Sequence, residues 1–190
     1  MNRSKENERL PSGQYRVDEL PVLHVGSVPV FNQASWTFEA YGLVEKPLKL
    51  SWADFLSLLR NTSISDFHCV QGWSRLNNNW EGVSFRTIAE IVKPKPEARF
   101  CTIECEGGYT TSLPIKDLMN EDVLFAYRLD GEELGTEHGG PLRLVVPKKY
   151  AYKSAKWVRR IKFTKEQELG YWEKRGYSNT ADPWKEERYS

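Results

Sequence analysis

The stretch ISDFHCVQGWSRLNNNWEGV, residues 64–83, decides both the fold and the chemistry that we expect of this chain. It holds Cys69 between His68 and a Gly72-Trp73-Ser74 turn, ahead of two tryptophans in a polar segment that we expect to form a loop. A strand should enter this loop from Ser65. A single thiol placed in this way can supply one soft anionic metal ligand or one nucleophile.

Two short helices are expected outside this stretch. Ser51, with Asp54 three residues later, is typical of a capping box. The residues that follow share one apolar helical face, made by Trp52, Phe55, Leu56 and Leu59. Ser84 should cap the second helix, in which apolar residues recur at the same spacing: Phe85, Ile88, Ala89 and Val92.

Strands account for most of the remaining pattern. Segments with strand character lie at 35–41, 99–105, 109–113, 123–129, 142–147 and 157–163. Gly107 and Gly108 should turn the second of these into the third as a hairpin. Strands with few helices and no regular βαβ alternation predict an α+β, β-rich mixed fold. We expect one domain over residues 16–190, after a disordered lead-in over residues 1–15.

Composition excludes several classes of partner. The chain has 190 residues, with 27 Lys plus Arg, 26 Asp plus Glu and a formal net charge of +1. This balance gives no electrostatic reason to expect nucleic acid or an anionic membrane surface as a partner. No segment approaches the roughly 20 apolar residues of a membrane span. A polar N-terminus without a signal peptide predicts a cytoplasmic protein with reduced thiols.

The other two cysteines, Cys101 and Cys105, are not expected to bridge each other. Residues four apart on a strand lie about 13 Å apart, whereas a disulfide needs Cα atoms within about 7 Å. Cys101 is expected to be a small buried side chain. Cys105 ends its strand, where functional sites cluster. For this residue, a buried core position and a place in a site both stay open. Neighbouring strand residues point to opposite faces, so His68 is poorly placed to act as a base for Cys69.

The segment EHGGPLRLVVPKKYAYKSAKWVRRIKF, residues 137–163, is the most basic part of the chain. Arg143 can bind a phosphate through a bidentate fork and Lys156 as a point charge. Ser154 adds a hydroxyl donor, and the Gly-Gly-Pro run after His138 leaves bare backbone that a ligand can approach. The alternative is a hairpin whose basic side chains are solvated. The local excess of positive charge favours an anionic ligand.

These residues resemble a known family. The runs HCVQGWSRLNNNWEGV, GYTTSLP, HGGPLRLVVP and YKSAKW are similar to the molybdopterin-binding domain of sulfite-oxidase-type molybdoenzymes. The similarity is closest to small stand-alone members related to the protein-methionine-sulfoxide reductase catalytic subunit, and it covers roughly residues 20–190. The resemblance implies the fold of that domain and a molybdenum-dependent oxidoreductase with one molybdenum and a single pterin.

The resemblance also implies roles for individual residues. Cys69 is similar to the thiolate that ligates molybdenum. Residues that correspond to pterin and phosphate contacts are Cys105, His138, Arg143, Ser154, Ala155 and Lys156. Residues that correspond to the loop covering the cofactor are His24, Ser27 and Val28. Candidates for the substrate-facing rim, which under the alternative interpretation only pack, are His24, Trp73, Tyr109 and Tyr152.

Differences between this chain and the family pattern limit the range of substrates that we expect. Sulfite oxidases carry an arginine in the N-terminal loop, where this chain has Leu23 and His24. We therefore expect oxygen-atom or two-electron transfer to a small sulfoxide or N-oxide rather than sulfite oxidation. No haem module or flavin motif is present, so a separate protein should give or accept the electrons. The alternatives are a non-catalytic pterin-binding scaffold and a thiol enzyme based on Cys69.

Four aromatic residues near the C-terminus complete the pattern: Tyr171, Trp172, Tyr177 and Trp184. Large rings bury much apolar area. We expect them to pack an irregular tail against the domain.

Overall fold

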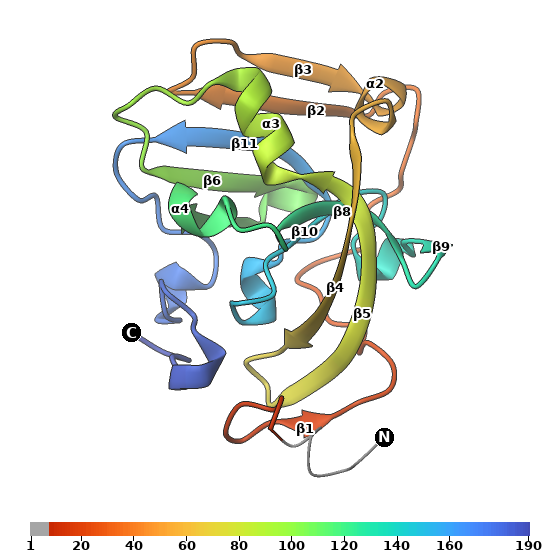
Figure 1. The fold of residues 1–190 in the computed structure, drawn as a ribbon, viewed down its shortest axis with the longest axis vertical. Helices are drawn as coiled ribbons and strands as arrows, with labels where there is room; N and C mark the ends of the chain where they lie inside the picture. Colours follow the sequence, from red (N-terminus) through yellow and green to blue (C-terminus); the bar gives the residue numbers. More distant parts are fainter. Residues whose placement is uncertain (1–7) are drawn as a thin grey trace.

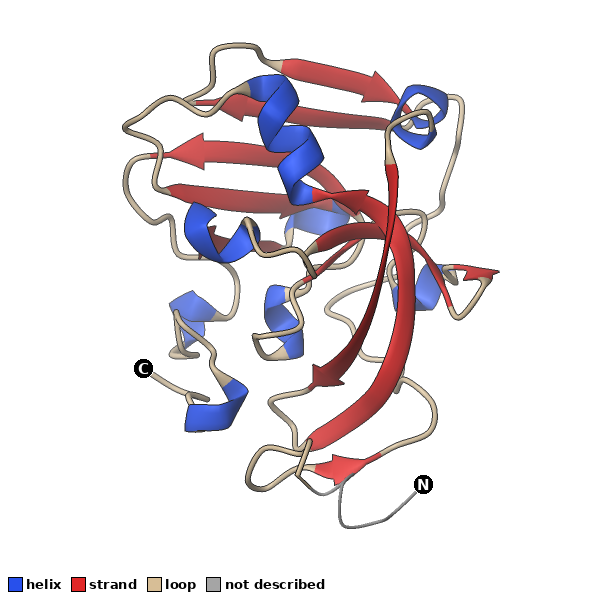
Figure 2. Cartoon of the chain, in the orientation of Figure 1, coloured by secondary structure: helices blue, strands red, loops and turns tan. Residues whose placement is uncertain are grey.

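The computed structural model describes residues 8–190, which form two β-sheets and a few short helices (Figures 1 and 2). The fold is α+β and rich in strands, as the sequence predicts. Each sheet combines strands from distant parts of the chain, and neighbouring strands are mostly antiparallel. The described part of the chain therefore shows no regular βαβ alternation, in agreement with the predicted fold class.

The five-stranded sheet lies in the upper part of Figure 1 and runs in the order β3-β2-β11-β6-β7. Its strands are β2 (Thr37–Gly42), β3 (Leu48–Ser51), β6 (Phe100–Cys105), β7 (Thr110–Pro114) and β11 (Val158–Thr164). β11 pairs parallel with β2 and antiparallel with β6, so the last strand of the chain is the central one. The four strands predicted in this sheet are confirmed, and β3 is an additional strand.

The predicted hairpin of β6 and β7 is also confirmed. Its turn, η1 (Glu106–Gly108), contains Gly107 at φ 75° and Gly108 at φ 81°, which only glycine adopts without strain. Cys101 and Cys105 are buried and both are free thiols. Burial raises the pKa of each thiol well above its usual value. Both side chains therefore behave as small apolar groups of the core.

The second sheet has six strands: β1 (Tyr15–Arg16), β4 (Arg60–His68), β5 (Trp73–Ser84), β8 (Leu124–Leu129), β9 (Glu132–Glu133) and β10 (Arg143–Val145). β4 and β5 form a long antiparallel hairpin that descends through Figure 1. Arg60 faces Val83 at one end, and His68 faces Ser74 at the other. This register places Cys69 in the turn at the tip of the hairpin.

The prediction of a polar loop after the turn is wrong, because residues 73–84 form the longest strand in the described part of the chain. Every second side chain is buried, including Asn78 and Trp80, while Asn77 and Asn79 between them are exposed. The Asn78 amide donates to the carbonyls of Ser65 (3.0 Å) and Arg75 (2.8 Å). Asparagine is depleted in strands, but Asn78 and Asn79 pair with β4, and the strand continues into residues 80–84, which pair with β8 as well.

Residues 8–190 contain three α-helices: α2 (Trp52–Leu56), α3 (Phe85–Val92) and α4 (Ile115–Leu118). The capping box of Ser51 and Asp54 and the cap at Ser84 are confirmed. The apolar face predicted for the first helix is confirmed for Trp52 and Phe55, which pack in the core, and wrong for the two leucines. Leu56 and Leu59 are 44% and 70% exposed, because the helix ends at Leu56 and the chain enters β4 at Arg60.

The core has two parts. The larger one joins the five-stranded sheet to α3 through apolar side chains that include Phe38, Ile88, Ile103, Ile161 and Phe163. The smaller one lies along β4, β5 and β8 and includes Phe67, Cys69, Trp73, Trp80 and Leu124. Burial of each large apolar side chain stabilises the fold by about 1.5–3 kcal/mol. The Cys69 turn therefore rests on a packed apolar cluster.

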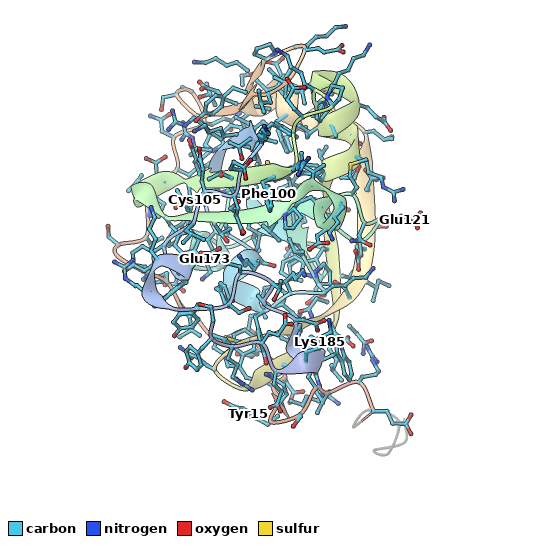
Figure 3. The ribbon with its side chains drawn as sticks, turned by 90° about the vertical axis from the view of Figure 1, so that its left-hand side faces the viewer. Tyr15, Phe100, Cys105, Glu121, Glu173 and Lys185 are labelled. Atoms are coloured by element: carbon cyan, nitrogen blue, oxygen red, sulfur yellow. The ribbon has the colours of Figure 1, made fainter. Side chains whose placement is uncertain are left out.

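Both ends of the chain pack near the Cys69 turn. The part of the predicted lead-in at residues 1–7 lies outside the described residues, whereas residues 8–15 are folded against the hairpin: Arg9 pairs with Asp66, and Tyr15 begins β1. The C-terminal tail contains η4 (Glu173–Arg175) and η5 (Pro183–Lys185). Figure 3 shows Glu173 beneath the strand that carries Phe100 and Cys105. Within residues 8–190, every helix is too short or too polar to span a bilayer.

Candidate functional site

One cavity of about 460 Å³ lies beside the tip of the β4–β5 hairpin. Its volume falls in the range of small-molecule sites. Most residues that the sequence analysis singled out line it: His24, Cys69, Trp73, Tyr109, His138, Arg143, Tyr152, Ser154, Ala155 and Lys156. Side chains from the middle of the chain and from both ends thus meet around one space.

Cys69 stands in a tight turn that closes the hairpin. Its N–H donates to the Trp73 carbonyl at 2.8 Å, and the Gly72 N–H donates back to the Cys69 carbonyl at 3.0 Å. Gly72 has φ 100°, and a side chain there would approach the Gly13 carbonyl oxygen to 3.3 Å. Burial raises the pKa of the Cys69 thiol, which is only 7% exposed. The turn therefore holds one thiol rigidly at the cavity wall.

Gln14, from the N-terminal segment, supports the turn from behind. Its Nε2 donates to the Cys69 carbonyl at 3.0 Å, and its Oε1 accepts from Ser74 Oγ at 3.0 Å. Because the Ser74 proton is used in that bond, Ser74 Oγ accepts from His68 Nδ1 at 2.8 Å. His68 is thus committed to Ser74, is not among the residues that line the cavity, and is not a base for Cys69.

Arg143 brings a buried positive charge to the opposite wall. Its guanidinium donates to the carbonyls of His138 (2.8 Å) and Ser154 (2.9 Å), and it lies over the rings of Phe67 and Trp80. Its buried Nε has no hydrogen-bond partner. Burial lowers the pKa of Arg143 to about 10. Among residues 8–190, no carboxylate forms an ion pair with it, so the charge is available to an anionic ligand.

Lys156 is a second basic side chain that has no carboxylate partner among the described residues. Its ammonium donates to the carbonyls of Leu23 (2.7 Å) and Glu137 (2.5 Å), and none of the described carboxylates pairs with it. Burial, and then the charge of Arg143, lower the pKa of Lys156 to about 7. Burial, followed by Lys156 and Arg143, also lowers the pKa of His138. This wall of the cavity therefore favours an anion.

Gly139 allows the two basic side chains to approach each other. It has φ 110°, and a Cβ there would lie 3.0 Å from both Arg143 Cβ and Lys156 Cγ. Ser154 is fixed nearby, because its Oγ accepts from the Val146 N–H at 2.9 Å. The hydroxyl proton of Ser154 remains free to be donated. The predicted approach of a ligand to bare backbone at the glycines is not found, because Gly139 and Gly140 do not line the cavity and the neighbouring Arg143, Lys156 and Leu134 occupy the space beside them. The predicted role of Ser154 as a donor stays possible.

The remaining wall is aromatic. Tyr109 and Tyr152 come from the domain, and Trp172 and Tyr177 come from the C-terminal tail. The tail was expected only to pack against the domain, so its place in the cavity was missed. Its cluster of aromatic residues was the only signal in the sequence. Trp184 packs only in part, because its ring meets that of His68 edge-on at 6.2 Å while 57% of the residue stays exposed.

Three predicted residues are not brought to the cavity. Ser27 is exposed on the loop before β2, and Val28 beside it also does not line the space. Cys105 is buried at the end of β6 without forming part of the wall. Among the described residues, no group of three or more His, Cys, Asp or Glu side chains is placed to hold a metal ion.

Known proteins resemble this chain over most of its length. A family model described as "Oxidoreductase molybdopterin binding domain" matches residues 25–172. The "Uncharacterized oxidoreductase YuiH" of Bacillus subtilis (strain 168) is 45% identical over 188 residues, which are 98% of this chain and 95% of that protein. The protein-methionine-sulfoxide reductase catalytic subunit MsrP of Campylobacter jejuni is 33% identical over 160 residues, 75% of this chain and 54% of that protein.

A solved structure supports the same relationship. The sulfane dehydrogenase SoxCD from Paracoccus pantotrophus superposes with a TM-score of 0.69 and 26% identity, over 76% of this chain and 42% of that one. This chain thus spans about half of MsrP and less than half of the SoxCD chain. The matched region holds Cys69, Arg143 and Lys156. The chain belongs to the sulfite-oxidase-type family of molybdopterin-binding oxidoreductases and is an enzyme that depends on a molybdenum cofactor.

Proposed function

We propose that the Cys69 thiolate is the ligand that this chain gives to molybdenum, and that Arg143 and Lys156 hold the phosphate of the pterin. One observation carries the proposal: the thiol and both unpaired cations line the same cavity. The residues fit such a group. Arg143 keeps a buried N–H without a partner, and the lack of a side chain at Gly139 lets the aliphatic parts of Arg143 and Lys156 lie close together.

Each residue around the cavity has a role that follows from its contacts. A thiolate is a soft, strongly donating ligand, which suits molybdenum. The Ser154 hydroxyl can donate to the phosphate, because its bond from the Val146 N–H uses one oxygen lone pair and leaves the hydroxyl proton free. Ala155 is small and buried beside it, which leaves room for the pterin. When bound, the cofactor supplies two-electron and oxygen-atom transfer, and the chain supplies binding and orientation.

We infer that the reaction is the reduction of a small uncharged sulfoxide or N-oxide. The S–O or N–O bond breaks, two electrons and two protons are consumed, and the oxygen leaves as water. Two observations favour this direction over sulfite oxidation. Relatives such as MsrP are named as sulfoxide reductases. The loop where sulfite oxidases carry an arginine contributes Leu23 and His24 to the cavity.

The electrons would come from a separate protein or a soluble carrier. SoxCD and MsrP, which this chain only partly covers, are longer than it is. The identity of the donor and the cytoplasmic location expected from the sequence remain predictions. Separating cytoplasmic from exported protein in the native host tests the location.

The proposal is tested on protein purified from cells that make the cofactor. We expect about one molybdenum and one pterin per chain, with reduction of dimethyl sulfoxide and trimethylamine N-oxide by reduced viologen. Cys69→Ser should abolish turnover, because serine cannot supply the soft thiolate. Cys101→Ala is the matched control, since Cys101 is a buried free thiol away from the cavity.

Three results would contradict the proposal. Protein from such cells that carries no molybdenum would exclude a metal at this site. Wild-type turnover by Cys69→Ser would exclude the thiolate ligand. Sulfite oxidation at a rate comparable with sulfoxide reduction would overturn the assigned direction. A loaded cofactor without turnover on any of these substrates would instead favour the scaffold alternative.

A further inference from the structure

Four aromatic rings form a continuous wall of the cavity, which we call the aromatic wall: Tyr109, Tyr152, Trp172 and Tyr177. The ring of Tyr177 meets that of Tyr152 edge-on at 5.5 Å and that of Trp172 at 4.8 Å. Trp172 and Tyr177 belong to the C-terminal tail, and Tyr177 lies beyond the residues matched by the family model. This wall is therefore built partly by a segment outside the shared domain.

Two hydroxyl groups of the aromatic wall, those of Tyr109 and Tyr152, are already used in hydrogen bonds within the protein. Tyr109 Oη donates to the Tyr152 carbonyl at 2.6 Å, and Tyr152 Oη donates to the Ser178 carbonyl at 2.6 Å. Burial raises the pKa of both phenols, so they remain neutral. A substrate that needs strong hydrogen-bond donors finds both of these hydroxyls already engaged.

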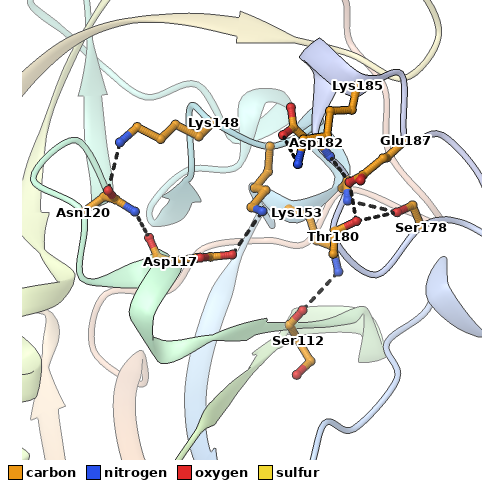
Figure 4. A network of polar contacts seen from close by, with 12 residues as sticks. Ser112, Asp117, Asn120, Lys148, Lys153, Ser178, Thr180, Asp182, Lys185 and Glu187 are labelled. Carbon is orange, nitrogen blue, oxygen red and sulfur yellow. Dashed lines mark hydrogen bonds and ion pairs between the residues drawn. The ribbon is translucent and has the colours of Figure 1, made fainter.

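The wall is also held rigidly. Glu173, next to Trp172, is fully buried, and its Oε1 accepts from Lys153 Nζ at 2.5 Å and from Thr111 Oγ1 at 2.6 Å. The Lys153 ammonium also donates to the Ser112 carbonyl at 3.0 Å (Figure 4). These bonds fix the tail to β7. Pre-organised rings lose little freedom when they bind a ligand.

Charge is distributed unevenly around the cavity. Its basic side chains are His24, His138, Arg143 and Lys156, all outside the aromatic wall. None of the described residues that line the cavity is an aspartate or a glutamate. Once an anionic cofactor occupies the basic side, the aromatic wall offers neither a cation for an oxyanion nor a carboxylate for a cationic substrate.

We propose that this wall selects uncharged sulfoxides that carry a flat aromatic group next to the S–O bond, such as aryl methyl sulfoxides. The inference rests on the proposed reductase function and names its substrate class. A phenyl ring placed on the wall buries more apolar area than a methyl group does, and it also gains ring–ring contact, which a methyl group cannot make. The step is balanced: the S–O bond breaks, and two electrons from reduced viologen with two protons release a sulfide and water.

The test compares methyl phenyl sulfoxide with dimethyl sulfoxide on the holoenzyme, with reduced viologen as donor. We expect kcat/KM to be roughly 10- to 100-fold higher for the aryl substrate. Reduction of dimethyl sulfoxide with no preference for the aryl compound would overturn this inference and leave the reductase function in place. A holoenzyme that reduces neither sulfoxide but does reduce trimethylamine N-oxide would overturn this inference alone, and one that reduces none of the three would overturn both.

Variants of one ring separate stacking from general damage to the tail. Tyr177→Leu keeps bulk but removes the ring, and should lower the aryl preference by about 10-fold. Tyr177→Phe restores the ring and should restore the preference. Trp184→Leu changes a mostly exposed aromatic residue of the same tail, outside the cavity, and should keep the wild-type ratio. A full aryl preference in Tyr177→Leu would contradict the proposal.

Discussion

Lys153 and Lys156 lie three residues apart, yet the chain treats their charges in opposite ways. The Lys153 ammonium is completely buried and pairs with the equally buried Glu173 at 2.5 Å. The Lys156 ammonium donates to the carbonyls of Leu23 and Glu137 and lies over the Trp157 ring, and no carboxylate among residues 8–190 pairs with it. Burial lowers the pKa of both side chains. One charge is neutralised inside the protein, and the other is left for a ligand.

This difference separates the two sides of the cavity. The Lys153–Glu173 pair fixes the C-terminal tail, and with it Trp172 of the aromatic wall. On that side of the cavity the buried charges stabilise the fold, and the rings are left to contact the substrate. The Lys156 side holds two cations without carboxylate partners among residues 8–190, which costs stability until an anion binds. Loss of the Lys153–Glu173 pair should therefore lower the stability of the fold, whereas loss of the Lys156 charge should weaken cofactor retention without lowering that stability.

The largest effect should come from breaking the buried pair. Glu173→Gln leaves the Lys153 ammonium buried without a counter-charge, and should lower the free energy of unfolding by about 3–5 kcal/mol. Denaturant titration of the cofactor-free protein measures it. Lys49→Gln breaks the exposed pair with Glu39 and is the matched control, with an expected loss of about 1 kcal/mol or less.

A double variant sharpens this test. Lys153→Met with Glu173→Leu removes both charges and should be more stable than Glu173→Gln alone, because no unpaired charge stays buried. A Glu173→Gln variant no less stable than the Lys49 control would mean that the pair does not hold the tail.

A smaller effect, on binding rather than folding, is expected at Lys156. Lys156→Met removes one charge-assisted hydrogen bond to phosphate, worth about 1.5–3 kcal/mol, so pterin should bind about 10- to 100-fold more weakly. The cofactor-free variant should be at least as stable as the wild type, because a buried unpaired charge is gone. Pterin released per chain after dialysis measures retention, and a Lys156→Met protein that keeps its pterin as well as the wild type would contradict the assignment.

The smallest effect is a dependence on pH. In the cofactor-free protein, burial and Arg143 hold the pKa of Lys156 at about 7, well below its ordinary value, while Glu137 opposes the shift. Between pH 7 and the ordinary pKa, the unfolded chain keeps a proton that the folded chain has released. Stability relative to Lys156→Met should therefore rise with pH above 7, and cofactor affinity should fall. Denaturation of both proteins at pH 6, 7.5 and 9 gives the difference, and a pH-independent difference would contradict the shift.

Local signals in the sequence predicted much of the fold. The capping groups at Ser51 and Ser84 and the glycines between β6 and β7 are short-range features, and each is found where expected. The convergence of Cys69, Arg143 and Lys156 on one cavity was inferred from chemistry and from family resemblance. The geometry agrees with that inference, although the roles themselves remain to be tested.

The features that were missed depend on contacts between distant residues. Three consecutive asparagines hide β5, whose pairing on both sides is visible only in the folded sheet. Leu59 satisfies a helical period, but the helix stops before it. Gln14 and Tyr177, at opposite ends of the chain, reach the Cys69 turn and the cavity through tertiary packing alone. No local pattern reports such an approach.

The central claim is that Cys69 supplies one sulfur ligand to molybdenum. X-ray absorption at the molybdenum edge, on wild-type holoenzyme and on Cys69→Ser, tests it most directly, because it counts sulfur neighbours without requiring turnover. We predict that the variant has one Mo–S bond fewer than the wild type, while Cys101→Ala keeps the wild-type count. An unchanged number of Mo–S bonds in Cys69→Ser would contradict the account.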